Sequence, residues 1–325
     1  MPKRSLAKQL DQAVQAMLDH AGSAPPPVAA GLVDLVHLAA ELRQLPRKEF
    51  KENLKSDLQR RSEMAAMTVP YIPEGFHTLT PYLVVKDAAA KVIEFARQAF
   101  GAEEIFRFNT PTGSIMHAEF RVGDSMVEIG DSIQQYPPLP ATIHLKIDDV
   151  DAVYARALAA GGVSLSPPTD QPYGERGCAV KDVGGNHWYI ASPLGQTHFL
   201  PDQRTVTPYM HVEGAARCIE FLKQAFGAEE VMRHQTPDGV VEHAKVRIGD
   251  SVMEMGEAHG DYPAMPLNLH LYVPDADAVY RQALAAGATS VRELRDEAYG
   301  DRIGGVRDPF GNWYWVATHI KDVQS

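Results

Sequence analysis

The sequence has few cysteines and no long apolar run, and each absence excludes a class of protein. Only Cys178 and Cys218 occur among the 325 residues, and neither belongs to a CxxC motif. Two isolated cysteines cannot build a disulfide scaffold and are typical of a chain kept in a reducing cytoplasm. No stretch approaches the ~18 consecutive apolar residues of a membrane-spanning helix. We therefore expect a cytoplasmic protein without a membrane segment.

A basic surface and phosphate-binding loops are also missing. The net charge is −11; residues 1–70 hold 10 Lys and Arg against 8 Asp and Glu, and the rest holds 21 against 34. Nucleic-acid binding needs a basic stripe, so nucleic acid is not an expected partner. No G-x-G-x-x-G or G-x-x-x-x-G-K motif is present. Polar residues such as Asp11 and Gln15 interrupt the N-terminus where a signal peptide has its apolar core, so secretion is not expected.

A duplication dominates what is present. Residues 94–186 align with residues 220–312 without a gap at a constant offset of 126, so that "IEFARQAFGAEE" matches "IEFLKQAFGAEE". Upstream, "TPYLVVKDA" matches "TPYMHVEGA" at an offset of 127. Such self-similarity indicates repeated structural units. It predicts two homologous domains, residues 76–196 and 203–320.

Each repeat contains a second, weaker rhythm. A strand-like run at 78–86 precedes an Ala-rich helical pattern at 88–100, which three short strand-like runs follow. The pattern then recurs from 141–148 through a second helix, a Pro/Gly-rich loop at 163–176 and a closing strand. The sequence therefore predicts an α+β fold of four βαβββ modules, two in each domain.

The segment 1–70 differs from the repeats. Its pattern predicts helices, interrupted at "GSAPPP", with Phe50, Leu54 and Leu58 recurring every four residues in the last of them. An amphipathic appendage of this kind is more typical of a docking element than of a catalytic one. We expect this helical N-terminal segment to lie on the body, or to serve a protein partner or self-association.

The stretch "MHAEFRVGDSMVEIGD", residues 116–131, predicts a hairpin that turns at Gly123-Asp124. The turn pairs 122 with 125, 121 with 126 and 119 with 128, and alternation then gives the strands one apolar and one polar face. In the second repeat, Lys245 is expected opposite Glu254, a favourable pair. The apolar face would hold Ala118, Phe120, Val122, Val127 and Ile129, and the polar face His117, Glu119, Arg121, Met126 and Glu128.

Other strands alternate in the same way. His144 and His270 recur on one face of equivalent strands, and several aromatic residues share the polar faces. A sheet face that gathers His, Tyr and Trp is typical of a binding pocket, although an antiparallel sheet can also expose one face to water. The aromatic candidates for ligand contact on these strands are Tyr82, Tyr189, Tyr209 and Trp315.

The repeated βαβββ units, the "TPYL" opening, the "MHAE" hairpin with its "GDS" turn and the "RDPFGNWYWVATH" ending together resemble the vicinal oxygen chelate superfamily. The likeness is to its glyoxalase/bleomycin-resistance branch, in the PhnB-like group, and it covers about residues 76–320. It implies two modules that close into a half-barrel around a cleft, with the two domains packed as a covalent pseudo-dimer.

The resemblance also implies one divalent metal held by His or Glu from the first and last strands of each module. At those positions only the two glutamates are metal ligands, so no tightly bound metal is expected. The positions hold Thr80, Glu128, Thr142 and Tyr189 in the first repeat, and Thr207, Glu254, Asn268 and Trp315 in the second.

A divalent metal stays as the alternative, because two His and one carboxylate form a recognised open triad. The same six residues are the candidate acids and bases if the protein is catalytic. They form two expected sets: His117, Glu128 and His144, and then His243, Glu254 and His270.

The motif "YGER" and its copy "YGDR" precede the closing strands. Arg176 and Arg302 can offer a guanidinium fork to an anionic ligand, with Tyr173 and Tyr299 beside them. The alternative is that each arginine fixes its own loop by pairing with a local carboxylate such as Asp182 or Asp308.

Together these features predict a tandem protein that binds a small polar or anionic molecule. The enzyme alternative is a metal-dependent glyoxalase-like lyase or an extradiol-type dioxygenase, in which the metal chelates adjacent substrate oxygens. A third alternative is an interaction protein that uses its helical N-terminus. The sequence does not identify the ligand.

Overall fold

Four βαβββ modules follow one another along the chain, as the sequence predicts. The computed structural model describes residues 69–195, 199–201 and 203–322, so the expected N-terminal helices lie outside the described residues. The first repeat contains β1 (Leu79–Val85), α4 (Ala89–Phe100), β2 (Glu103–Asn109), β3 (Ile115–Val122), β4 (Ser125–Asp131), β5 (Thr142–Lys146), α5 (Val150–Ala159), β6 (Val163–Gln171), β7 (Glu175–Lys181) and β8 (His187–Pro193).

The second repeat has the same order of elements. It contains β9 (Val206–Val212), α6 (Ala215–Phe226), β10 (Glu229–Gln235), β11 (Val241–Ile248), β12 (Ser251–Glu257), β13 (Asn268–Tyr272), α7 (Ala276–Ala285), β14 (Thr289–Asp296), β15 (Asp301–Arg307) and β16 (Trp313–His319). Among the described residues, no helix is long and apolar enough to cross a membrane.

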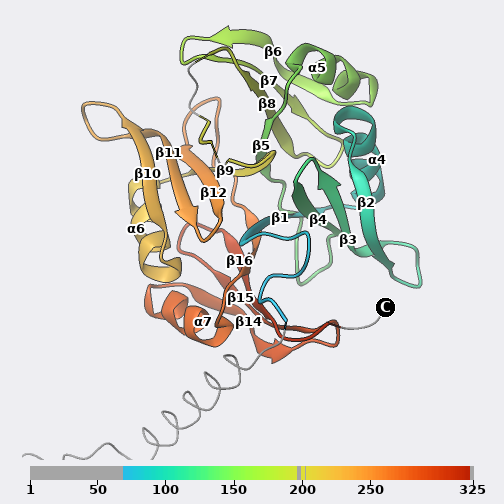
Figure 1. Ribbon diagram of the computed structural model, residues 1–325, viewed down its shortest axis with the longest axis vertical. Helices are drawn as coiled ribbons and strands as arrows, with labels where there is room; N and C mark the ends of the chain where they lie inside the picture. Colours follow the sequence, from blue (N-terminus) through green and yellow to red (C-terminus); the bar gives the residue numbers. More distant parts are fainter. Residues whose placement is uncertain (1–68, 196–198, 202, 323–325) are drawn as a thin grey trace, which may run out of the picture. The chain divides into compact units, whose positions relative to one another are not determined.

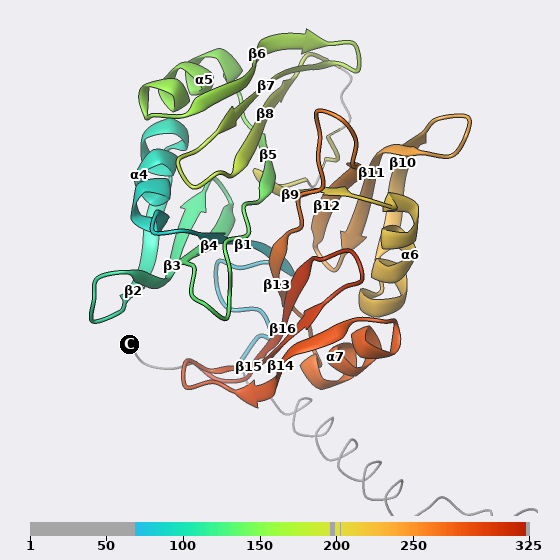
Figure 2. The same ribbon diagram turned by 180° about the vertical axis from the view of Figure 1, so that it is seen from behind.

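The strands form two eight-stranded sheets, and each sheet takes one module from each repeat (Figures 1 and 2). The first sheet has the order β14-β15-β16-β13-β1-β4-β3-β2, and the second β10-β11-β12-β9-β5-β8-β7-β6. The joins are antiparallel: β1 pairs with β13, with Thr80 opposite His270, and β5 pairs with β9, with His144 opposite Thr207. The resemblance implied that the two modules of one repeat close each half-barrel, and this expectation is wrong. Each half-barrel combines one module from each repeat.

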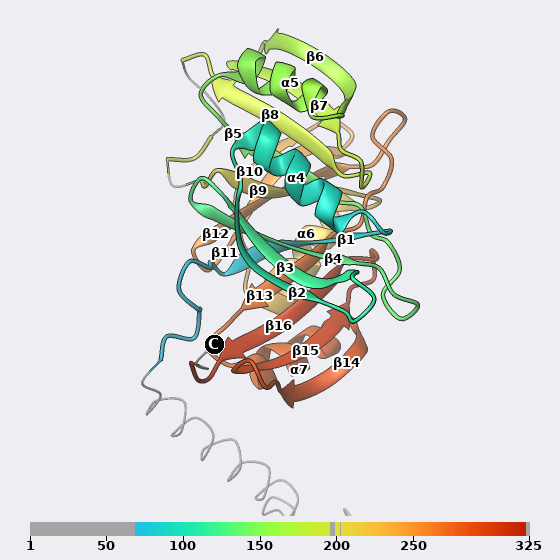
Figure 3. The ribbon, with the colours of Figure 1, turned by 90° about the vertical axis from the view of Figure 1, so that its right-hand side faces the viewer.

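The helices that cover the apolar faces of the sheets, in contrast, pair within each repeat. Helices α4 and α5 lie side by side over the backs of their own strands (Figure 3). The rings of Phe100 and Trp188 pack 4.9 Å apart, and Arg156 Nε donates to the carbonyl of Ala99 at 3.1 Å. In the second repeat, the rings of Phe226 and Tyr314 pack at 4.6 Å. The helices of each repeat thus pack over strands of the same repeat, while the sheet edges pair across the repeats.

The helix boundaries follow local chemistry. Gly101 ends α4 in the left-handed region at φ 71°, where a residue with a side chain would be strained. Asp149 and Asp275 accept hydrogen bonds from backbone N–H groups in the first turns of α5 and α7. At α4 the carboxylate comes from another element: Asp131, at the end of β4, accepts from the N–H groups of Ala88 and Ala89.

A second expectation about the fold is also wrong. The segment 163–176, expected as a loop, contains strand β6, which lies at the edge of the second sheet. The prolines 167 and 168 suggested a loop because proline cannot donate to a ladder, but an edge strand tolerates it. Arg176 consequently lies in β7 and not in a long loop.

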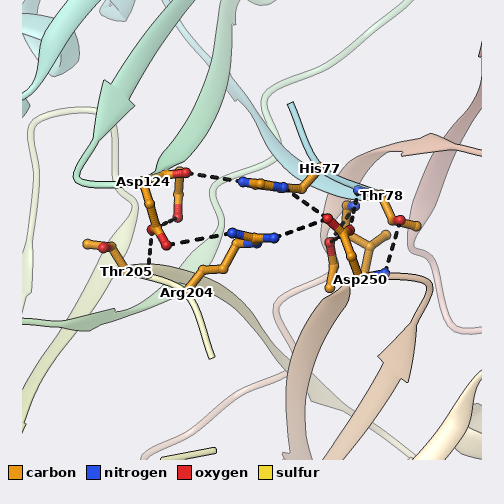
Figure 4. Close-up of polar contacts among 9 residues, drawn as sticks. His77, Thr78, Asp124, Arg204, Thr205 and Asp250 are labelled. Atoms are coloured by element: carbon orange, nitrogen blue, oxygen red, sulfur yellow. Dashed lines mark hydrogen bonds and ion pairs between the residues drawn. The ribbon is translucent and has the colours of Figure 1, made fainter. Parts of the chain in front are cut away.

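The two sheets meet at the turns of equivalent hairpins, next to His77 and Arg204 (Figure 4). Asp124 Oδ1 accepts from the N–H of Thr205 at 2.9 Å, and Asp250 Oδ1 accepts from the N–H of Thr78 at 2.8 Å. Each turn therefore binds the chain that leads into the first strand of the other repeat. Arg204 lies between the two carboxylates, 3.1 Å from Asp250 and 3.7 Å from Asp124.

Candidate functional site

The β3–β4 hairpin has the predicted register. Val122 pairs with Ser125, and Glu119 lies opposite Glu128; the equivalent hairpin places Lys245 opposite Glu254. The residues of the predicted apolar face are buried in the core. The polar face of β3 and β4 thus points to the opposite side of the first sheet, where β13 and β16 continue it.

A cluster that we name the first polar centre consists of Tyr82, His117, Glu119, Glu128 and His270. His270 Nδ1 lies 3.0 Å from Glu128 Oε1. His117 contacts Glu119 through Nε2 at 3.2 Å and the Tyr82 hydroxyl through Nδ1 at 3.3 Å. Three different strands of one repeat and one strand of the other therefore supply this centre.

The Glu128–His270 pair is buried, and each residue shifts the pKa of the other toward the charged form. The two residues are only 3% and 7% exposed. Burial alone raises the pKa of Glu128, but the charge and the hydrogen bond of His270 hold it below its ordinary value. Burial lowers the pKa of His270, yet the adjacent Glu128 carboxylate raises it above its ordinary value. Both directions favour an imidazolium beside a carboxylate, a form in which both ring nitrogens of His270 carry a proton.

The equivalent cluster in the second sheet, the second polar centre, consists of His144, Gln203, Tyr209, His243, Lys245 and Glu254. Three groups contact the Glu254 carboxylate: His144 Nδ1 at 2.8 Å, Lys245 Nζ at 2.8 Å and Gln203 Nε2 at 2.7 Å. Burial alone raises the pKa of Glu254, but His144 and Lys245 lower it strongly. The hydroxyl of Tyr209 lies 3.3 Å from His243 Nδ1.

The chain between the repeats covers the second polar centre. Gln203 accepts from Lys245 Nζ at 2.7 Å, and the ring of Phe199 lies 5.2 Å from the His144 ring. The ammonium of Lys245 also lies 5.5 Å from the centre of the Phe199 ring. Lys245 and Glu254 are 1% and 0% exposed. The first polar centre is more open, since the His117 side chain is 30% exposed.

The expected grouping of the histidines is wrong. His144 contacts Glu254 and not Glu128, and His270 contacts Glu128 and not Glu254. The physical reason is the exchange of sheet edges: β5 pairs with β9 of the other repeat, and β13 with β1. Each carboxylate thus meets the histidine of the opposite repeat.

A divalent metal fits the first polar centre and does not fit the second. Among the described residues, His117, Glu119 and Glu128 form a group whose ligand atoms all lie within 4.8 Å of one another. A histidine and two carboxylates are ordinary donors to divalent cations. In the second polar centre Lys245 replaces Glu119, and its ammonium already neutralises the carboxylate that would bind the ion.

The two motif arginines are engaged within the protein. Arg176 binds Asp151 and Asp170, each at 2.6 Å, and Arg302 binds Asp277 and Asp296. These pairs tie β7 to α5 and β15 to α7, which supports the alternative that each arginine fixes local structure. The expected partners Asp182 and Asp308 are not involved. They accept hydrogen bonds from Trp188 and Tyr314 of the closing strands, and from Asn186 and Asn312 just before them.

The aromatic candidates fall on both sheets. Tyr82 and Trp315 lie on the polar side of the first sheet, while Tyr189 lies beside Tyr209 on the second, with ring centres 5.8 Å apart. Tyr173 and Tyr299, at 50% and 56%, are exposed.

Sequence reasoning missed several residues that these centres use. Lys245 was correctly predicted opposite Glu254 but was not named as a site residue. Gln203 and Phe199 were missed because they belong to a connection without periodicity. Arg292, whose guanidinium lies 4.8 Å over the Trp315 ring, gave no sequence signal because it is outside every repeated motif.

Comparison with known proteins agrees with the duplicated architecture. The model of the Glyoxalase/Bleomycin resistance protein/Dioxygenase superfamily matches residues 76–190 and again residues 205–316. An uncharacterized protein of Mycobacterium tuberculosis is 36% identical over 140 residues, which are 40% of this chain and 82% of the relative. An uncharacterized protein of Mycobacterium bovis is 37% identical over 129 residues, covering 36% of this chain and 85% of the relative.

Solved structures share the fold at low sequence identity. Glyoxalase I from Zea mays superimposes with a TM-score of 0.56 at 15% identity, over 74% of this chain and 92% of the maize chain. This similarity bears on the fold alone. The two matches of the family model cover most of the described residues, and the chain therefore belongs to the Glyoxalase/Bleomycin resistance protein/Dioxygenase superfamily as a tandem duplication.

Proposed function

We propose that the protein binds a small polar molecule at the first polar centre, and that the second polar centre is structural. The observation that carries this proposal is His270 Nε2, which is buried and has no hydrogen-bond partner. A buried donor without a partner costs about 1–3 kcal/mol, so a ligand oxygen that accepts from it has a strong reason to bind there.

The neighbouring groups support a ligand with both acceptors and donors. Asn268 Oδ1, on the same strand as His270, is also buried without a partner and requires a donor. Glu119 and His117 remain partly exposed at the other side of Glu128. The pKa of His117 is raised because Glu119 and Glu128 outweigh the effect of its burial. His117 is therefore suited to hold or move a proton on a bound ligand.

A second candidate function is metal-assisted chemistry at the same centre. It is favoured by the set His117, Glu119 and Glu128, whose donors converge. A divalent cation there would supply Lewis acidity toward a ligand oxygen. The protein would hold the cation through these three side chains, while His270 keeps the Glu128 carboxylate oriented.

The test is a small-molecule thermal-shift panel, with and without Mn²⁺, Ni²⁺ or Zn²⁺, on the wild type and on matched variants. Ligands of the folded state raise Tm by mass action. We expect shifts without added metal that His270→Gln abolishes, because the unpaired Nε2–H is lost. The matched change His144→Gln in the second polar centre should preserve those shifts, measured from its own baseline.

Two outcomes decide between the candidates. Shifts that survive His270→Gln would contradict the proposed site. Shifts that require a metal and disappear in Glu119→Gln, together with one bound ion per chain by elemental analysis, would favour the metal-assisted alternative. Glu119 contacts only His117 among the residues of its centre, so its removal should leave the Glu128–His270 pair in place.

A further inference from the structure

Buried polar atoms without partners gather at one end of the first sheet. Among the described residues six such side-chain atoms occur, and five of them belong to Asn268, His270, Arg292 and Trp315. These residues lie on neighbouring strands: His270 is opposite Trp315 in the β13–β16 ladder, and Gly305 of β15 separates Trp315 from Arg292 of β14. Native proteins satisfy most buried polar groups, so such a concentration is unusual.

The free atoms of Arg292 form one specific edge of the guanidinium. Nε and Nη2 are buried and unpaired, while Nη1 lies 3.1 Å from Glu297. The Nε–Nη2 edge is the one that arginines of this chain use elsewhere to hold a carboxylate with two hydrogen bonds. In the part of the chain that the structure describes, five arginines do so: Arg97, Arg107, Arg176, Arg233 and Arg302.

The charge of Arg292 has a carboxylate partner, but not one of its own. Its neighbour Glu297 is shared, because Arg295 Nε lies 2.8 Å from the same carboxylate oxygen. One carboxylate therefore serves two guanidinium groups. A second carboxylate would balance the charge and fill the Nε–Nη2 edge, which charge-assisted bidentate pairing favours.

An aromatic floor lies beneath this edge. The Arg292 guanidinium lies 4.8 Å over the Trp315 ring, and the Tyr136 ring meets Trp315 edge-on at 5.4 Å. The arrangement depends on Gly305, since a Cβ there would lie 2.8 Å from the indole atom Cζ3 of Trp315. Trp313, 6.5 Å from Trp315, extends the aromatic surface.

The second sheet lacks this arrangement. At the constant offset of 126, Ser166, Ala179 and Tyr189 stand where the first sheet has Arg292, Gly305 and Trp315. Ser166 has no cation, the Cβ of Ala179 occupies the space that Gly305 leaves for the ring, and Tyr189 has no indole donor. The arrangement therefore does not follow from the fold itself.

We propose that Arg292 and Trp315 form a subsite for the carboxylate of a planar, aromatic or unsaturated organic acid. The carboxylate occupies the Nε–Nη2 edge of Arg292 and accepts from the indole N–H of Trp315, and the planar body packs on Trp313 and Trp315. This inference rests on the proposed function and names the ligand class of that site. Because the free atoms have no exposed surface, Tyr136, from the segment between β4 and β5, moves aside on binding.

The experiment titrates the full chain with benzoate, with benzamide as the uncharged probe of the same shape. The readout is the indole N–H signals of the three tryptophans in ¹⁵N-labelled protein, assigned with Trp315→Phe. We expect benzoate to shift the Trp315 signal in a saturable way and benzamide to leave it in place. Trp188, buried in the core of the first repeat, is the internal reference.

Matched variants locate the binding. Arg292→Lys keeps the positive charge but loses the two-pronged edge, so we expect benzoate to bind about tenfold or more weakly. Arg295→Lys is the control, because Arg295 pairs with the same Glu297 while its side chain is 61% exposed. Its benzoate affinity should stay within about twofold of the wild type.

Several results would overturn the subsite: no saturable benzoate binding, equal binding of benzamide, an unmoved Trp315 signal, or unchanged affinity in Arg292→Lys. If panel ligands still require His270 in that case, the proposed function stands and the acid subsite alone fails. If benzoate binds through Arg292 while His270→Gln leaves every panel ligand unaffected, the assignment of the first polar centre fails instead.

Discussion

A single exchange of residue type separates the two polar centres. Glu119 in the first sheet corresponds to Lys245 in the second, and each lies opposite a buried glutamate. Two facing carboxylates require cations from elsewhere, which His117 and His270 supply in part. A lysine facing a carboxylate needs no further ion. The residue at this one backbone position therefore leaves the first polar centre able to bind a further cation or ligand, whereas the second polar centre is neutralised by its own lysine.

His211 illustrates how the environment of one residue sets its charge. The imidazole is 6% exposed and lies among aromatic rings, 4.8 Å from Tyr209 and 5.3 Å from Tyr262 between ring centres. Burial lowers its pKa to about 4, and the charges of His187 and His259 act in the same direction. His211 is therefore neutral in the folded protein at neutral pH.

We predict that His211 makes the protein less stable in acid. Its folded pKa lies below the ordinary value of 6.5, so its contribution is complete above pH 6.5 and is lost as pH falls toward 4. The difference between a pKa of 6.5 in the unfolded state and about 4 in the folded state corresponds to about 3 kcal/mol of folding free energy. The free energy of unfolding can be measured in urea at several pH values. Between pH 7 and pH 4 the wild type should lose about 3 kcal/mol more of it than the His211→Gln variant.

The control for this comparison is the same pair of proteins between pH 7 and pH 8. In that range the folded imidazole stays neutral and the unfolded one is mostly neutral, so the two stability curves should run nearly parallel. Parallel curves that continue down to pH 4 would show that the buried imidazole does not contribute to acid sensitivity.

At the scale of elements, the connection between the repeats does more than join them. Phe199 and Gln203 belong to this connection and lie against His144, Lys245 and Glu254. The connection thus supplies both an apolar cover and an amide that hydrogen-bonds with the ion pair. The equivalent segment before the first repeat places Ile72 and Phe76 against the cluster of Tyr272 and Trp315. Within its described residues it offers apolar contacts but no amide to the first polar centre, where His117 and Glu119 are partly exposed.

The buried Lys245–Glu254 pair leads to a stability prediction. Removing one partner of a buried ion pair leaves an uncompensated charge and costs about 3–5 kcal/mol. We expect Lys245→Met to reduce the free energy of unfolding by up to about this amount in urea denaturation, since His144 and Gln203 still contact the Glu254 carboxylate. The double variant Lys245→Met, Glu254→Gln should recover most of the loss, because no buried charge is left alone.

The matched control lies in the first sheet. Glu119→Met changes the equivalent position, where the side chain is 21% exposed and contacts a histidine. Its effect should stay below about 1 kcal/mol, as for other partly exposed pairs. A loss in Lys245→Met no larger than in Glu119→Met would mean that the second polar centre is not held together by its ion pair.

Local rules predicted the elements well, with one kind of exception. Alternation and the Gly123-Asp124 turn gave the register of the β3–β4 hairpin, including Glu119 opposite Glu128. Gly123 has φ 60°, which the turn requires. The strand β6 was not predicted because its two prolines indicated a loop. Prolines are tolerated there because β6 is an edge strand that pairs on one side only.

At the scale of the molecule, the repetition itself limited prediction. Because the two copies resemble each other, a strand edge that can pair with β5 can equally pair with β13. The sequence therefore shows which strand forms an edge, but it does not show whether that edge pairs with a strand of the same repeat or of the other repeat. The choice decides the composition of both polar centres, and this is why Glu128 was expected beside His144 and lies beside His270.

Contacts at the junction of the sheets favour the exchanged arrangement. Asp124, at the β3–β4 turn, binds the chain that leads into β9, and Asp250, at the β11–β12 turn, binds the chain that leads into β1 (Figure 4). Burial raises the pKa of Asp250, but hydrogen bonds from the N–H and hydroxyl groups of Thr78, from Ser251 and from His77 hold it below its ordinary value. The two repeats are thus joined by charged groups as well as by sheet edges.

We predict that neither repeat folds as a monomer by itself. Separation would leave the edges of β1 and β5 without their partners β13 and β9, and exposed edges of this kind promote association. Fragments 1–198 and 199–325, co-expressed as separate chains, should purify as a one-to-one complex that retains the Glu128–His270 contact across the two chains. Size-exclusion chromatography and amide exchange test this expectation. A monomeric fragment with protected amides in β1 or β9 would contradict it, because that repeat would then complete its own sheet.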